Sequence, residues 1–348
     1  MQFLSNDVGI DLGTSNVLMY VDGKGVIIRE PSVVAFDKNS QKILQVGSAA
    51  RNMMGRTPGN ICAMYPLRDG IISDHEMTVK LLDTFFRSIS KSSWFTPKPR
   101  VVISVPSGIT EVEERTVINA ALEAGARRVY LIEAPLAAAL GAGLDIKDPG
   151  GHMVVDIGGG VTDIAVLTMN DVAVSASINV GGGTFDKAIA RYIRQKYNIA
   201  VGLPTAEDLK IQIGAAYDRP DDSSMTVKGR ELKTGIPREI PITSSELINV
   251  LERPALAIAD EILSVLENAD PELAGDVGAN GITLTGGGSQ LWGIDKLISK
   301  RTGVMCTVAD DPESCVAYGC GKSLAWINRM TEGPINIARR QAIRSWNQ

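Results

Sequence analysis

Short apolar runs alternate with helical patterns along most of the chain. The runs at about 101–105, 129–132, 153–157 and 281–285 are short and mainly apolar. Runs of this kind between helical segments are typical of strands in an α/β sheet that is covered on both faces. The pattern therefore predicts an α/β fold.

Three capping-box patterns mark the expected helix starts. Ser73, Thr110 and Thr243 are each followed three positions later by a glutamate, an arrangement in which the side chains satisfy the first backbone N–H groups of a helix. The helix after Thr110 is expected to end at Gly125. Its predicted apolar face consists of Val117, Ile118, Ala121 and Leu122.

An acidic residue followed by a glycine-containing loop occurs twice, at domain-sized separation. The first copy is DLGTSN at 11–16, and the second is DIGGGVTD at 156–163. Each follows a short apolar run and leads into a predicted β-hairpin, with Asp22-Gly23 and Asn170-Asp171 as the two-residue turns. The repetition indicates a duplicated unit whose two tight turns face each other across a cleft.

The two loops have the chemistry of a phosphate site. Small residues let backbone N–H groups approach phosphate oxygens, and Asp11 and Asp156 are placed to hold Mg²⁺ through water. A third strand and glycine loop, ITLTGGGS at 282–289, is placed where an adenosine can lie. The alternative is that all three are structural turns, but their repetition favours a nucleotide site.

Composition narrows the class of protein. A chain of 348 residues is longer than a single hydrophobic core usually supports, which suggests two domains. Its 44% apolar content is ordinary for a soluble protein, and a net charge of −5 excludes the basic footprint of a nucleic-acid binder. No secretory signal precedes Asp7, and no uninterrupted apolar stretch reaches the ~18 residues of a membrane span.

The cysteines are expected to be reduced thiols. Cys62, Cys306, Cys315 and Cys320 form no Cys-x-x-Cys pair, and the chain has two histidines as possible further metal ligands. Zinc binding or disulfides are the alternatives, and the spacing supports neither of them.

The order of these motifs resembles the superfamily of actin, sugar kinases and the seventy-kilodalton heat-shock chaperones. Within it, the chain is most similar to the bacterial actin MreB family, from about residue 7 to about 330. The motifs that carry the resemblance are IDLGT at 10–14, EPSVVA at 30–35, GRTPGN at 55–60, PLRDG at 66–70, VVDIGGG at 154–160 and LTGGG at 284–288.

The resemblance implies an actin-like fold: two duplicated ribonuclease-H-like domains around a nucleotide cleft, each with a small inserted subdomain. Domain I is expected to comprise 1–140 and about 312–348, with its small subdomain at about 31–64. Domain II is expected at 141–311, with its small subdomain at about 181–242. Glycines and a proline between 141 and 151 make a hinge plausible at the boundary.

The resemblance also implies roles for residues of the cleft, with ATP and Mg²⁺ as cofactors. One wall holds the phosphates with Asp11, Gly13, Thr14, Ser15 and Asn16. The other wall uses Gly158, Gly159, Gly160, Thr162 and Asp163, with Asp156 on the metal or the water. The adenosine is expected on Gly286, Gly287, Gly288 and Ser289.

Two further segments are assigned to the nucleotide with an alternative left open for each. Gly182 lies in a glycine triplet that opens a helix, so its N–H can donate to a phosphate oxygen, or the glycines merely allow the turn. Glu207, Asp208 and Lys210 match the segment that related proteins use on the ribose and base edge. Taken alone, Glu207 and Lys210 form a solvated i,i+3 ion pair.

One position departs from the family pattern. Where MreB proteins read Ile-Glu-Glu-Pro, this chain reads Ile-Glu-Ala-Pro at 132–135, so Ala134 replaces the residue that orients the attacking water. Slow hydrolysis with intact nucleotide binding is expected, because phosphoryl transfer depends on positioning. Glu133 is a catalytic candidate only if the strand is bulged, since adjacent strand residues point to opposite faces.

The function implied by the resemblance is that of an ATP-dependent filament protein that determines rod shape by organising cell-wall synthesis. It is expected in the cytoplasm at the inner face of the cell membrane, with itself, the inner leaflet and wall-elongation membrane proteins as partners, and not with nucleic acid. A small-molecule kinase or a chaperone-type ATPase is the alternative. The kinase needs a second substrate pocket, and the chaperone needs a peptide-binding domain after about residue 330.

A membrane contact is expected at Trp94 and Phe95, two aromatic residues in the polar segment 92–99. MreB proteins often carry an apolar loop here that enters the bilayer, and Trp suits the headgroup boundary. The alternative is that both rings fold back onto the domain. Phe3, Leu4 and the basic segment 337–346 are further candidates for a membrane anchor.

Overall fold

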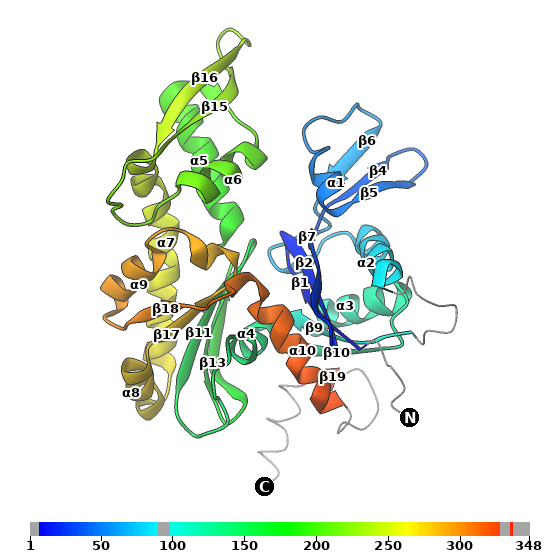
Figure 1. Ribbon diagram of the computed structural model, residues 1–348, viewed down its shortest axis with the longest axis vertical. Helices are drawn as coiled ribbons and strands as arrows, with labels where there is room; N and C mark the ends of the chain where they lie inside the picture. The colour runs from blue at the N-terminus through cyan, green and yellow to red at the C-terminus, as the bar shows by residue number, and fades with distance from the viewer. Residues whose placement is uncertain (1–6, 90–97, 328–334, 337–348) are drawn as a thin grey trace.

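Two mixed β-sheets, each in its own lobe, organise the molecule (Figure 1). The computed structural model describes residues 7–89, 98–327 and 335–336. The first sheet has the order β19-β10-β9-β1-β2-β3 and the second β13-β12-β11-β17-β18. In each, three consecutive antiparallel strands form a meander, and parallel strands extend the sheet beside the first strand of that meander. This repeated topology confirms the predicted duplication and the α/β class.

The strand bounds place the two sheets in the sequence. The strands of the first sheet are β1 Val8–Leu12, β2 Asn16–Val21, β3 Gly25–Pro31, β9 Arg100–Val105, β10 Arg128–Glu133 and β19 Ile335–Asn336. The strands of the second sheet are β11 His152–Ile157, β12 Thr162–Thr168, β13 Asp171–Ile178, β17 Ile282–Thr285 and β18 Cys306–Val308. All four predicted apolar runs are therefore strands.

Both predicted hairpins form, but the second turn lies one residue earlier than expected. Asp22 and Gly23 lie in the loop between β2 and β3, which closes with a 2.9 Å hydrogen bond from the Lys24 N–H to the Val21 carbonyl. In the second hairpin Asp171 pairs with Thr168, so the turn residues are Met169 and Asn170. Both have positive φ, 49° and 60°, as a turn that follows the strand twist requires.

Helices cover both faces of each sheet. They are α1 Gly47–Arg51, α2 His75–Ile89, α3 Glu111–Glu123, α4 Ala134–Ala142, α5 Gly182–Tyr197, α6 Leu203–Ile213, α7 Ser244–Asn268, α8 Pro271–Asn280, α9 Ile294–Thr302 and α10 Cys315–Ile327. Helices α2 and α3 pack on the outer face of the first sheet, and α5, α7 and α9 pack on that of the second. None of the helices in the described part of the chain is long and apolar enough to cross a membrane.

The three capping predictions have different outcomes. Thr110 forms the complete capping box with Glu113. At α2 the prediction was wrong about the capping residue, because the Asp74 carboxylate, one position after Ser73, accepts from the Met77 N–H at 3.0 Å. Thr243 caps α7 through the Glu246 N–H at 3.4 Å.

Two side-chain predictions for these helices failed. The Glu246 carboxylate does not complete the box, because it accepts from Tyr192, Lys196 and Tyr197, all on α5. On α3, Val117 and Ala121 are buried as expected, but Leu122 is 42% exposed. Ala120 is buried in place of Leu122 on the packed face of this helix.

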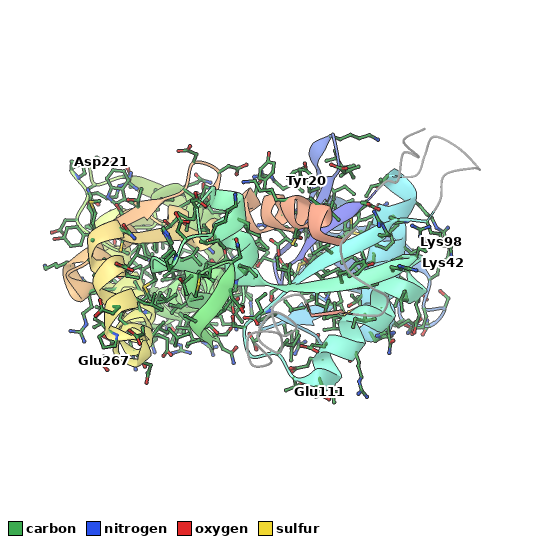
Figure 2. All side chains as sticks on the ribbon, turned by 90° about the horizontal axis from the view of Figure 1, so that it is seen from below. Tyr20, Lys42, Lys98, Glu111, Asp221 and Glu267 are labelled. Atoms are coloured by element: carbon green, nitrogen blue, oxygen red, sulfur yellow. The ribbon has the colours of Figure 1, made fainter. Side chains whose placement is uncertain are left out.

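A shared core lies between the two sheets. Helices α4 and α10 pack there against strands of both lobes, and Figure 1 shows α10 between the lobes. The backbones of the two helices are in close contact at Gly141, where an added Cβ would lie 1.7 Å from the Cys315 carbonyl oxygen. Tyr20 of β2 lies beside α10 (Figure 2), with its ring centroid 5.9 Å from that of Tyr318.

Two small sheets lie at the same end of the molecule, one on each lobe (Figure 1). The first contains β4 Val34–Asp37, β5 Ile43–Val46 and β6 Ile61–Met64, with α1 packed nearby. The second contains β14 Ile199–Ala200, β15 Ser224–Glu231 and β16 Pro237–Thr243. A two-stranded ribbon, β7 Leu67–Arg68 with β8 Ile71–Ile72, follows the first. The exact domain boundaries, and motion at the hinge, stay predictions.

Candidate functional site

A cleft of about 550 Å³ lies between the two lobes. The loops after β1 and β11 face each other across it at very short range. A Cβ added at Gly159 would lie 2.0 Å from Ser15 Oγ, and one added at Gly160 would lie 2.5 Å from Thr14 Oγ1. The structure thus confirms that the two tight turns face each other across a cleft, and it explains why glycine is required in the second loop.

A backbone hydrogen bond joins the two ends of each loop. The Gly13 N–H donates to the Asn16 carbonyl at 3.1 Å, and the Gly158 N–H donates to that of Val161 at 2.9 Å. Among the described residues no acceptor pairs with the N–H groups of Ser15, Gly159 and Gly160. Unpaired backbone donors that line a cleft are suited to bind an anion.

Three carboxyl groups converge on this cleft, with Asp156 and Asp163 buried and Asp11 partly exposed. Asp11 accepts from Ser104 Oγ at 3.1 Å, Asp156 from Thr285 Oγ1 at 2.8 Å, and Asp163 from the backbone N–H of Ser107 at 3.0 Å. All three belong to the cleft lining. They come from both lobes, so the lobes share one acidic centre.

Burial raises the pKa of each of these carboxyl groups. The pKa of Asp11 rises to about 7, because of burial and the charge of Asp156. The pKa of Asp163 also rises to about 7 for the same two reasons, and that of Asp156 rises to about 6 because of burial. Negative charge is therefore costly here unless a cation neutralises it.

A hydrated Mg²⁺ fits this donor set. Mg²⁺ usually binds one or two carboxylates, retains several waters and takes its remaining ligands from substrate phosphates. In the described part of the chain no group of three or more His, Cys, Asp or Glu side chains is arranged to hold a metal directly. Asp11 and Asp156 would therefore hold the ion in part through water, beside the backbone donors.

The third glycine loop packs against the end of β11. Gly286 has φ +78°, and Cβ atoms added at Gly286 and Gly288 would lie 2.4 Å from atoms of Ile157. These glycines and Gly287 line the cleft. Ser289 is buried, and its hydroxyl donates to the Gly286 carbonyl at 2.7 Å, so it holds the loop and does not line the cleft.

The start of α5 differs from the expected phosphate site. The N–H groups of Gly182 and Gly183 donate to the carbonyls of Gly158 and Gly159 at 2.9 and 2.8 Å. These donors therefore support the loop after β11 and are already paired. Gly182 lines the cleft, and its carbonyl accepts from Lys210 Nζ at 3.1 Å.

The remaining predicted residues separate into two groups. Asn16, Glu207 and Lys210 line the cleft. Asp208 is exposed and does not belong to the cleft lining, and Thr162 is fully buried with its hydroxyl bonded to the Val180 carbonyl at 2.6 Å. Neither is brought to the cleft.

Ala134 and Glu133 diverge as the strand geometry predicts. Ala134 begins α4, is 8% exposed and lines the cleft. The Glu133 carboxylate accepts from Ser107 Oγ at 3.1 Å, and its charge contributes to the raised pKa of Asp163. The position that faces the cleft is therefore apolar.

Two lining residues, Arg219 and Trp292, had no signal in the sequence. Arg219 and Trp292 both line the cleft, with the guanidinium carbon 4.9 Å from the indole centroid. Gly70 also lines it and donates its N–H to Thr14 Oγ1 at 2.9 Å. Trp94, Phe95, Phe3, Leu4 and 337–346 lie outside the described residues.

Comparison with known proteins agrees with this geometry. Residues 5–332 match the MreB/Mbl protein family. The cell shape-determining protein MreB of Escherichia coli (strain K12) is 44% identical over 93% of this chain and 94% of its own length. The cell shape-determining protein Mbl of Bacillus subtilis (strain 168) is 45% identical over 92% and 96%.

Solved structures show the same architecture. The crystal structure of MreB5 of Spiroplasma citri bound to ADP has a TM-score of 0.88 and 41% identity, covering 92% of this chain and 97% of that one. The MamK double helical filament has a TM-score of 0.77 at 21% identity, over 93% and 99%. The fold is therefore actin-like, and the chain belongs to the MreB/Mbl family.

Proposed function

We propose that the protein binds ATP with Mg²⁺ in the cleft, assembles into filaments and determines cell shape. The convergence of Asp11, Asp156 and Asp163 with unpaired backbone donors carries the proposal. Relatives at 44–45% identity are named cell shape-determining proteins. The MreB5 structures of Spiroplasma citri are described as bound to ADP and to AMPPNP.

Different residues of the cleft are proposed to bind the phosphates, the metal ion and the adenosine. The N–H groups of Ser15, Gly159 and Gly160 would hold phosphate oxygens, and Asp11 and Asp156 would hold Mg²⁺ through water. The cation would neutralise the ionised carboxylates, whose pKa values are raised chiefly by burial. The loop at 286–288, which lines the cleft, would cup the adenosine.

Hydrolysis is proposed to be slow. Ala134 occupies the wall where the family places a water-orienting glutamate, and an alanine methyl group can neither accept nor donate a hydrogen bond. Glu133 is bonded to Ser107 and does not belong to the cleft lining. Nucleotide binding is expected to be intact, because the substitution at position 134 leaves the backbone N–H groups proposed to hold the phosphates in place.

Filament assembly is proposed to follow nucleotide binding. The cleft draws its walls from both lobes, so a ligand that contacts both walls favours their closed arrangement. The closed arrangement would present the surfaces that bind the next subunit. Paired protofilaments are expected from the family relationship.

The filament is proposed to lie on the inner face of the cell membrane, with wall-elongation membrane proteins as further partners. Trp94 and Phe95 are the proposed contact. Each ring contributes at most ~2–3 kcal/mol when buried, so single subunits bind weakly and filaments bind firmly through avidity. The test is liposome co-sedimentation of Trp94→Ala/Phe95→Ala beside the parent; a double variant that polymerises and binds lipid undiminished removes this contact.

Nucleotide binding is tested by titrating fluorescent ATP in Mg²⁺ and in EDTA. We expect saturable binding in Mg²⁺ that weakens at least about tenfold in EDTA, which removes the cation, and in Asp156→Ala, which removes one of its proposed ligands. Asp208→Asn is the matched control, because Asp208 lies on the exposed side of α6 in the same lobe. Equal affinity for the parent in both buffers would contradict the proposed metal role.

A further inference from the structure

One ion pair crosses the mouth of the cleft between the two small sheets. Arg51, the last residue of α1 in the first lobe, donates a hydrogen bond from Nη2 to Oε2 of Glu207 on α6 in the second lobe. The two side chains are 32% and 25% exposed. An ion pair at this depth is partly shielded from solvent, and it connects segments that are 156 residues apart.

The surroundings give Arg51 a particular electrostatic role. The pKa of the neighbouring Asp186 is raised to about 6, chiefly by burial; the charge of Glu207 also raises it, whereas Lys210 and Arg51 lower it. Lys210, from the same helix as Glu207, is already paired with Asp186 at 2.8 Å. Arg51 is therefore the cation that the first lobe contributes to an acidic rim on the second.

The other oxygen of Glu207 remains available to a ligand. Glu207 lines the cleft, and Arg51 engages Oε2, while Oε1 accepts no hydrogen bond among the described residues. A bound molecule with a hydroxyl group can donate to Oε1 without displacing Arg51. Arg51 then orients the carboxylate that the ligand uses.

We propose that Arg51 is a positioning residue that closes the mouth of the cleft over the nucleotide and sets the rate of its release. The inference rests on the proposed nucleotide site and deepens it. Release requires the two small sheets to separate, and separation breaks the pair between Arg51 and Glu207. Occupancy of Oε1 fixes Glu207 in the orientation that Arg51 contacts, so ligand and ion pair stabilise the same closed state.

The expected effect on release is moderate and depends on salt. Partly exposed ion pairs make small contributions to a closed state, so Arg51→Ala should release fluorescent ATP about fivefold faster than the parent. Raising the ionic strength should accelerate release from the parent and have a smaller effect on the variant, because salt screens the pair. Arg51→Lys should give an intermediate rate, since Lys retains the charge without the planar donor pair.

The experiment is a stopped-flow chase of fluorescent ATP in Mg²⁺ from the parent, Arg51→Ala, Arg51→Lys and Arg56→Ala. Arg56 is the matched control, because it is an exposed arginine just after α1 and does not belong to the cleft lining. Circular dichroism melts check that all four proteins are folded. The proposal expects an unchanged rate for Arg56→Ala.

Two results would overturn the inference. Equal release rates and equal salt dependence for Arg51→Ala and the parent would remove Arg51 from the closing of the cleft. Acceleration by Arg56→Ala equal to that by Arg51→Ala would assign the effect to general charge. Failure of the parent to bind ATP is a separate outcome, seen at the loading step, and it would overturn the proposed function and this inference with it.

Discussion

Replacing Asp156 by asparagine should stabilise the protein and impair its function at the same time. Asp156 is buried, and its side chain accepts a 2.8 Å hydrogen bond from Thr285. An asparagine oxygen can accept the same bond, so the substitution removes the charge and little else. The charge is useful only when a cation is bound to it.

The magnitude follows from the pKa. Burial raises the pKa of Asp156 from its ordinary 3.8 to about 6, and each tenfold change in proton affinity is ~1.4 kcal/mol. Ionised Asp156 therefore costs the folded state about 3 kcal/mol at pH 8. The stability that its protonated form contributes is present below pH 3.8 and is lost as the pH rises through 6.

The assay is urea denaturation of the parent and Asp156→Asn in buffer that contains EDTA and no nucleotide. We expect the variant to be more stable by about 1–3 kcal/mol at pH 8, and the gain to fall to about 1 kcal/mol or less at pH 4.5. Asp208→Asn, at an exposed carboxylate, should change stability by less than about 0.5 kcal/mol at either pH. A variant that is less stable than the parent at pH 8 would refute the reasoning about buried charge.

Three further predictions concern binding and turnover. Ala134→Glu should raise ATP hydrolysis about 10- to 100-fold in a phosphate-release assay, and an unchanged rate would contradict the role given to position 134. Gly159→Ala should weaken ATP binding in a fluorescence titration because its Cβ would meet Ser15, whereas Gly275→Ala, with open space around it, should not. Calorimetry should detect proton release when Mg²⁺·ATP binds at pH 6.5 but not at pH 8.5, because burial raises the pKa of Asp11 to about 7; equal release at both pH values would contradict this.

The duplicated fold was predictable because both halves of the chain contain the same local sequence pattern. A short apolar run, an acidic residue and a glycine loop occur in the same order in both halves, and both instances became a strand with its turn. The errors were local as well. The turn at Met169 and Asn170 depends on strand register, which a one-residue shift in pairing changes.

The parts of the site that consist of backbone loops were predictable from the sequence. The side chains that line the cleft were less predictable. The glycine loops reach the cleft because their positions after the strands fix them. Thr162 and Ser289 are in the same loops or next to them, but their hydroxyl groups satisfy carbonyls of the protein. The direction of such a side chain depends on which carbonyl lies nearest in the folded chain.

Contacts between the lobes could not be predicted from either segment alone. Arg51 and Glu207 are far apart in the sequence, and each looks like an ordinary charged residue of a helix. Trp292 follows the third glycine loop, yet its pairing with Arg219 depends on how α6 and the loop after it meet that turn. Such pairs exist only once the two lobes are folded.

Electron microscopy of the purified protein with ATP and Mg²⁺ on a lipid monolayer tests directly whether the protein forms nucleotide-dependent filaments on membranes. We expect paired, straight filaments on the lipid with ATP and Mg²⁺, and none when EDTA removes the metal. Analytical ultracentrifugation of the same sample supplies the complementary measurement in solution. Only monomers at high protein concentration with ATP and Mg²⁺, and bare lipid under the microscope, would contradict the account.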